Sequence, residues 1–66
     1  MGKTRRVYGF GGLGIDIDKV DHFRKVRHSD GFPGIEFTFF SGAYETAWYD
    51  YTSDRDSDFD WLCNNI

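Results

Sequence analysis

Residues 34–51, GIEFTFFSGAYETAWYDY, contain two runs of β-branched and aromatic residues on either side of Ser41 and Gly42. Apolar and polar residues alternate in the first run, as they do in a strand that buries one face. A short glycine-containing connection between two such runs favours a β-hairpin. This segment constrains the fold more than any other, because a hairpin with a buried face needs a second layer to cover it.

We take Ser41 and Gly42 as the two loop residues, so that Phe40 pairs with Ala43. Residues directly opposite each other share a face of a sheet. The predicted core face therefore consists of Ile35, Phe37, Phe39, Tyr44, Thr46 and Trp48. The predicted opposite face consists of Glu36, Thr38, Phe40, Ala43, Glu45, Ala47, Tyr49 and, where the strand continues, Tyr51.

The C-terminal segment SDRDSDFDWLCNNI predicts a helix of about three turns. Ser53 is a suitable N-cap, and the aspartates that follow it favour the positive end of the helix dipole. Apolar residues recur there with helical spacing and form one stripe of Phe59, Leu62, Cys63 and Ile66. We expect this stripe to lie across the sheet, with the Cys63 thiol packed and Trp61 pointing elsewhere.

The segment before the hairpin is compatible with a strand or a helix over residues 18–28. The preference of Val, Ile and Phe for sheets favours a strand at 14–17, a tight helical turn around Asp18–Val20 and a strand at 21–28. Residues 5–10 predict a further strand. The expected fold is a single α+β domain over residues 1–66, a small antiparallel β-meander of four to five strands with one C-terminal helix packed on one face.

Three segments, IDIDKVDHFRK, IEFTFFSGAYETAWYDY and SDRDSDFDWL, follow one another in this order. The order resembles that of small bacterial and phage β-meander-plus-helix proteins such as the flagellar FlbD-like family. Those sequences read roughly I-N-x-x-x-I-x-x-I-E, then a strand, a glycine turn, a strand and a helix. The resemblance covers about residues 15–64 and implies the fold; it brings no catalytic motif, and the aromatic richness of this chain departs from it.

The length of 66 residues allows a small core that needs dense packing, and aromatic residues make up 20% of the chain. Cys63 is the only cysteine, which excludes an internal disulfide and fits a reducing compartment. The sequence lacks the apolar runs of a signal peptide and of a membrane span. We therefore expect a cytoplasmic protein, in a bacterium or an infected host cell.

Charge is distributed unevenly along the chain, whose net charge is −3. Residues 1–28 hold seven basic and three acidic residues, which gives +4, whereas residues 29–66 hold one basic and eight acidic residues, which gives −7. The two parts either neutralise each other across the fold or create a dipolar surface. The overall acidity argues against binding to duplex DNA, where affinity depends on neutralising phosphates.

Gly9, Gly11 and Gly14 have the G-x-G-x-x-G spacing of a dinucleotide-binding turn. In that motif the third glycine opens a helix, whereas here the extended pattern IDID follows it. We interpret the glycines as a tightly packed strand junction, with a phosphate-binding nest beside Arg5 and Arg6 as the alternative.

Neither a metal site nor a catalytic group is predicted, and we expect no cofactor. The aspartates of DRDSDFDW resemble the start of a calcium loop, but Phe59 stands where that loop needs glycine and Asn65 where it needs glutamate. His22, His28 and Cys63 lack the paired spacing of zinc ligands.

The predicted second face of the hairpin has more aromatic surface than one helix can cover. Large exposed apolar surfaces usually bind a partner. We therefore predict a non-enzymatic accessory protein of phage or bacterial type that occludes a protein partner, such as a defence or regulatory factor. The predicted contact residues are Phe40, Tyr49, Tyr51 and Glu45.

Two alternatives remain open at this point. An oligomer could bind a nucleotide-like anion by aromatic stacking and arginine contacts, with the candidate residues Arg5, Arg6, Tyr8, Gly11 and Arg24. The chain could also be a structural subunit that associates with copies of itself.

Overall fold

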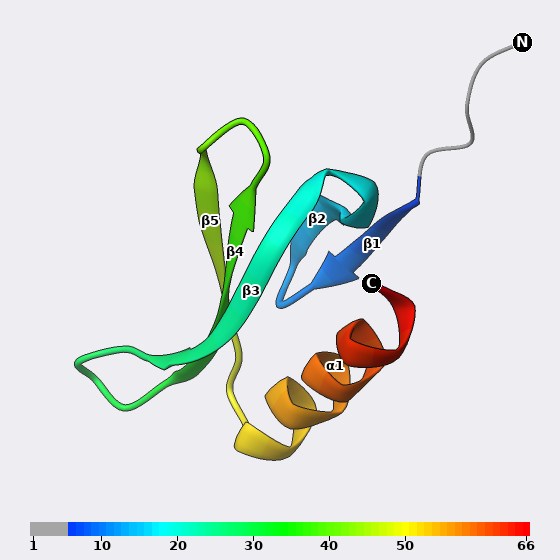
Figure 1. Cartoon of the computed structure of the whole chain (residues 1–66). Helices are drawn as coiled ribbons and strands as arrows, with labels where there is room; N and C mark the ends of the chain where they lie inside the picture. The colour runs from blue at the N-terminus through cyan, green and yellow to red at the C-terminus, as the bar shows by residue number, and fades with distance from the viewer. Residues whose placement is uncertain (1–5) are drawn as a thin grey trace, which may run out of the picture.

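The computed structural model describes residues 6–66 (Figure 1). Its elements, in chain order, are β1 (Val7–Phe10), β2 (Leu13–Asp16), a 3-10 turn (Ile17–Lys19), β3 (Val20–Arg27), β4 (Pro33–Phe39), β5 (Tyr44–Trp48) and α1 (Thr52–Asn65). β1 and β2 form a two-stranded antiparallel sheet, and β3, β4 and β5 form a three-stranded antiparallel sheet in that order. The predicted small α+β fold with a C-terminal helix is confirmed, with its strands divided between two sheets.

The 3-10 turn separates the two sheets. The Asp16 side chain accepts a hydrogen bond from the Asp18 amide, which caps the turn, and Val20 begins β3 directly after it. The predicted strand, tight turn and strand in this region are confirmed, so residues 20–27 are strand and not helix. The first predicted strand corresponds to β1, and its residue 5 lies outside the described residues.

The glycine-rich segment forms the β1–β2 hairpin. Phe10 pairs with Leu13, so Gly11 and Gly12 are the loop, with φ of +56° and +85°. Positive φ at both positions is what a type I′ turn requires. A Cβ at Gly11 would lie 2.6 Å from the backbone oxygen of Trp48 on β5. The interpretation of these glycines as a packed strand junction is therefore confirmed at Gly11, which lies against the backbone of its own chain.

The register of the β4–β5 hairpin differs from the predicted one. The Phe39 amide donates to the Ala43 oxygen at 2.8 Å, and Gly42 has φ of +94°, so the loop is the three residues 40–42. Glycine in this conformation closes a common three-residue hairpin loop. Phe37 consequently pairs with Glu45 instead of Thr46.

This shift of one residue exchanges the two faces of β5, because side chains alternate along a strand. Ala47 and Tyr49 are buried, whereas Tyr44 and Trp48 are 69% and 41% exposed. The predicted core face was therefore right for Ile35, Phe37 and Phe39 on β4 and wrong for the residues of β5.

The core lies between the three-stranded sheet and a second layer made of α1 and the β1–β2 hairpin (Figure 1). The rings of Phe10 and Phe37 are 5.4 Å apart, and those of Phe23 and Phe59 are 5.1 Å apart in an edge-on arrangement. The core comprises Phe10, Ile15, Ile17, Val20, Ile35, Phe37, Ala47, Tyr49 and Leu62.

Helix α1 presents a different face to the core than its apolar stripe predicts. Leu62 is fully buried and Phe59 is half-buried, but Cys63 and Ile66 are exposed. The packed thiol and the N-cap at Ser53 were wrong: Tyr51 occupies the N-cap position. The inward face instead includes Arg55, which is buried two turns before Leu62. It also includes Trp61, which packs against the core on Phe10, so the expectation that Trp61 points elsewhere was wrong.

The Arg55 guanidinium joins α1 to the sheet. Its Nη1 donates to the backbone oxygens of Val26 on β3 and Gly34 on β4, both at 3.1 Å, and its Nε donates to Asp56 at 2.7 Å. Lys25 lies 3.3 Å from the same carboxylate. Of these contacts, the Lys25–Asp56 pair joins the basic and acidic parts of the chain. The Arg55 hydrogen bond is the main reason that the pKa of Asp56 lies below its usual value.

Gly11→Ala should destabilise the protein more than Gly12→Ala. Both place alanine at positive φ, which costs about 1–2 kcal/mol. At Gly11 the new Cβ also meets the Trp48 oxygen, whereas at Gly12 it meets no described atom within 4 Å. Urea unfolding of the two variants measures the difference; equal losses would show that the close approach of β1–β2 to β5 contributes nothing.

Asp56→Asn should make the protein less sensitive to acid. Because the pKa of Asp56 is lower in the folded state, its contribution to stability is present above the unfolded pKa of about 3.9 and is lost as the pH falls through the folded pKa. Urea unfolding between pH 6 and pH 2 should therefore show a steeper loss for the wild type than for the variant. Parallel curves would mean that the Arg55 contact does not act on this carboxylate.

Candidate binding surfaces

The nucleophilic and metal-ligating side chains lie apart in the structure. His22 approaches Asp21 and His28 approaches Asp30, each on the surface of the β3–β4 hairpin, while Cys63 is exposed on α1. Within residues 6–66 no three His, Cys, Asp or Glu side chains are grouped so that they could hold a metal ion.

Tyr49, one of the four predicted partner-binding residues, is a core residue. Its side chain is buried, and its hydroxyl donates to Asp58 Oδ2 on α1 at 2.6 Å. Burial, followed by this hydrogen bond, raises the pKa of Tyr49 well above its ordinary value. The prediction that Tyr49 lies exposed on the second face is wrong, because the three-residue loop turns its side chain inward.

The other three predicted contact residues are exposed but do not form one surface. Phe40 is 71% exposed in the β4–β5 loop, and Tyr51 is 68% exposed directly before α1, beyond the far end of β5. Glu45 pairs with Phe37 and therefore lies on the core side of β5, where it remains exposed. That Phe40, Tyr51 or Glu45 contacts a partner therefore stays a prediction.

The residues of the predicted anion site are also separated. Arg6 binds Asp18 at 2.6 Å beside the 3-10 turn, and Tyr8 packs on Trp61 with ring centres 4.7 Å apart. Arg24 lies on the three-stranded sheet and binds Glu36 at 2.8 Å. The remaining two candidates are Gly11, which packs on β5, and Arg5, which lies outside the described residues.

The three-stranded sheet has a face that points away from α1 and the β1–β2 hairpin, and we call it the outer face. The pairing registers place on it His22, Arg24 and Val26 from β3, Gly34, Glu36 and Thr38 from β4, and Tyr44, Thr46 and Trp48 from β5. Among residues 6–66 no helix or strand covers this face.

Trp48 is held flat on the outer face by its neighbours. A Cβ at Gly34 would lie 2.6 Å from the indole ring, so the missing side chain makes room for it. His28 meets the same ring edge-on, with centres 5.1 Å apart. Trp48 and the more exposed Tyr44 thus stand two strand repeats apart on one side of β5.

The sequence contained a signal for this surface. Gly42 can close a three-residue loop as well as a two-residue one, and Gly34 leaves space for a large ring opposite it. The observed register pairs Gly34 with Trp48. Predicting it would have required preferring this pair over the pairing of Ile35 with Trp48, two large apolar residues, which the two-residue loop implies.

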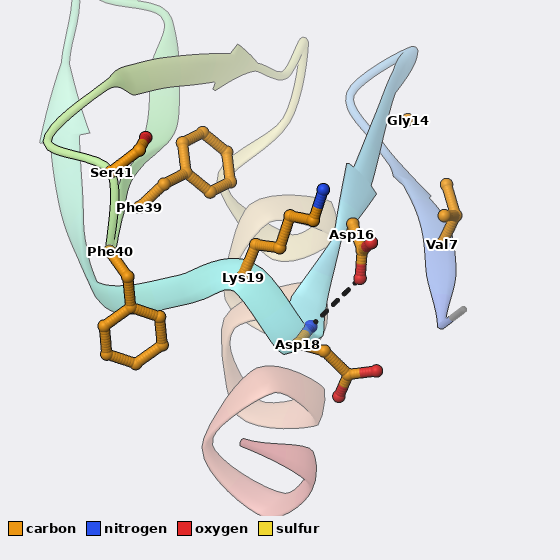
Figure 2. A pocket seen from close by; sticks show the side chains of 8 residues that line it. All are labelled: Val7, Gly14, Asp16, Asp18, Lys19, Phe39, Phe40 and Ser41. Atoms are coloured by element: carbon orange, nitrogen blue, oxygen red, sulfur yellow. Dashed lines mark hydrogen bonds between the residues drawn. The ribbon is translucent and has the colours of Figure 1, made fainter. Parts of the chain in front are cut away.

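A cavity of about 600 Å³ lies between the β1–β2 hairpin, the 3-10 turn and the β4–β5 loop (Figure 2). It is lined by Val7, Gly14, Asp16, Asp18, Lys19, Phe39, Phe40 and Ser41. Figure 2 shows the Lys19 side chain extending between the Phe39 ring and Asp16, while the Phe40 ring points away from them. A smaller cavity of about 190 Å³ is lined by Tyr8, Gly9, Phe10, Asp58 and Trp61.

Tyr49→Phe should lower the stability of the protein at neutral pH by about 1–3 kcal/mol, the usual contribution of a hydrogen bond to a charged group. Because the Tyr49 pKa is raised by folding, the wild type loses stability above pH about 10, where the unfolded chain releases the proton. The difference between the two proteins should therefore shrink between pH 9 and pH 11 in urea unfolding. A constant difference would place Tyr49 in solvent.

Comparisons of the chain with protein-family models, with curated proteins and with solved structures found no match. The resemblance to the FlbD-like family accordingly stays a prediction. Among residues 6–66, no helix is long and apolar enough to cross a membrane.

Proposed function

We propose that the protein is a non-enzymatic binding protein that occludes a protein partner through its outer face. The observation that carries this proposal is the exposure of Tyr44 and Trp48, with Thr46 between them, on a sheet face that no described element covers. Tyrosine and tryptophan are enriched among the residues that dominate protein–protein binding energies. We propose that it is an accessory factor of phage or bacterial type that acts on a defence or regulatory protein.

The charges of the outer face favour a protein over a nucleic acid. Arg24, a cation on β3, is paired with Glu36, whose carboxylate offsets its positive charge. Between these charges and the aromatic residues stand the hydroxyls of Thr38 and Thr46. Aromatic rings beside polar and charge-paired residues are typical of protein interfaces, whereas nucleic acid requires unpaired positive charge.

At the aromatic side of the outer face, the partner should dock on the face of the sheet rather than add a strand to the edge of β5. The Phe39–Ala43 and Pro33–Tyr49 hydrogen bonds direct the backbone groups of Tyr44, Thr46 and Trp48 away from β4. At Trp48 this edge is blocked by the close approach of Gly11. The rest of the β5 edge is too short to pair with an added strand of ordinary length.

Thr46→Lys, which places a charge between the two aromatic residues, should abolish partner binding while leaving the fold intact. Tyr44→Ala should weaken it by tenfold or more, since truncation of a dominant interface residue costs about 2 kcal/mol or more. Phe40→Ala is the matched control, because Phe40 is equally exposed but lies in the loop, off this face. Captured partner is purified from lysate of the source cells, and its Kd for each variant is measured by calorimetry.

Loss of binding in Phe40→Ala together with full binding in Thr46→Lys would contradict the proposal and return the interface to the β4–β5 loop. Failure to capture any saturable partner, with sedimentation showing an oligomer that Thr46→Lys dissociates, would also contradict it. That result would support a structural subunit whose outer faces bind each other.

A further inference from the structure

We infer that the cavity beside the 3-10 turn is a binding site for a small aromatic carboxylate. The site is separate from the outer face, because Phe39 and the β1–β2 hairpin lie on the core side of the sheet. Its volume of about 600 Å³ is in the range of pockets that enclose small organic ligands.

The cavity is built from three segments that are fixed to one another. The Phe40 amide donates to the Lys19 oxygen at 3.0 Å, which joins the β4–β5 loop to the 3-10 turn. The Ile17 amide donates to the Arg6 oxygen at 3.0 Å, which joins the same turn to the start of β1. The walls are therefore set by backbone hydrogen bonds before any ligand arrives, and such preorganisation lowers the entropic cost of binding.

Lys19 is the group that selects an anion. Among residues 6–66 its ammonium has no carboxylate within ion-pair distance, although Asp16 and Asp18 line the same cavity. Asp18 binds the Arg6 guanidinium, and Asp16 accepts the Asp18 amide. The carboxylates are thus engaged in holding the turn, while the Lys19 ammonium extends into the space between Phe39 and Asp16 (Figure 2). A ligand carboxylate there would gain a charge-assisted hydrogen bond.

The remaining lining fits a flat apolar body with one polar end. The Phe39 ring faces the cavity and can stack on an aromatic ligand, and Val7 supplies an aliphatic wall opposite it (Figure 2). Gly14 leaves the floor between them without a side chain. Ser41 Oγ accepts the Ala43 amide at 3.3 Å and lies across the Phe39 ring from Lys19 (Figure 2), so Lys19 alone marks the polar end of the site.

The test is a titration of the full 66-residue chain with 1-naphthoate, followed by amide resonances in NMR spectra. Saturable shifts are expected at Gly14, Lys19 and Ser41. Lys19→Met, which keeps the apolar stem, should weaken binding by tenfold or more. Lys25→Met is the matched control, because it removes one positive charge on β3, outside the cavity, and should bind as the wild type does.

The neutral analogue 1-naphthamide should bind at least tenfold more weakly than the carboxylate. Equal binding of the two analogues, equal affinity of Lys19→Met and the wild type, or shifts confined to the outer face would each overturn the inference. Tighter binding of 1-naphthylmethylamine would also overturn it, since the aspartates rather than Lys19 would then select the ligand. Thr46→Lys should leave the titration unchanged, which separates this site from the proposed protein interface.

Discussion

The three-residue loop between β4 and β5 is the constraint on which the rest of the structure depends. With Gly42 at positive φ, the loop sets the pairing of β4 with β5, and thereby decides which side of β5 enters the core. That side carries Ala47, whose small side chain lets the Gly11 turn approach the strand. It also carries Tyr49, whose hydroxyl reaches Asp58 on the helix. Both contacts to the second layer follow from one turn.

A chain of this size has a small apolar core, and polar contacts complete its attachment to the helix. Two contacts bind the N-terminal half of α1 to the sheet, one at Arg55, which donates to backbone oxygens of β3 and β4, and one about a turn later at Asp58, whose carboxylate accepts from Tyr49. A buried guanidinium needs such partners, because an unpaired charge in the core would be strongly destabilising. Asp56 and the two strand oxygens supply them.

Much of the fold could be predicted because it depends on local sequence. The 3-10 turn follows from the short-range capping by Asp16, and the packed glycine junction follows from positions that need positive φ. The β5 register could not be predicted in the same way. Ser41–Gly42 is compatible with loops of two or three residues, and aromatic side chains occur on both sides of the strand, so hydrophobic patterning does not select one.

The one-residue difference in the β5 register also explains why the exposed aromatic residues of β5 are not the predicted ones. Once Tyr49 turns inward, the aromatic residues left in solvent on β5 are Tyr44 and Trp48, and the pairing of Gly34 with Trp48 gives the indole a place to lie. The prediction for α1 failed for a different reason. The apolar spacing places Cys63 on the inward face, whereas in the structure Cys63 is exposed and Arg55 is buried there. Hydrophobic patterning treats Arg55 as a solvent-exposed residue, whereas the two strand oxygens beneath it and Asp56 make its burial favourable. Where a site depends on one residue of register or on one buried charge, it is therefore decided by tertiary contacts that no local pattern contains.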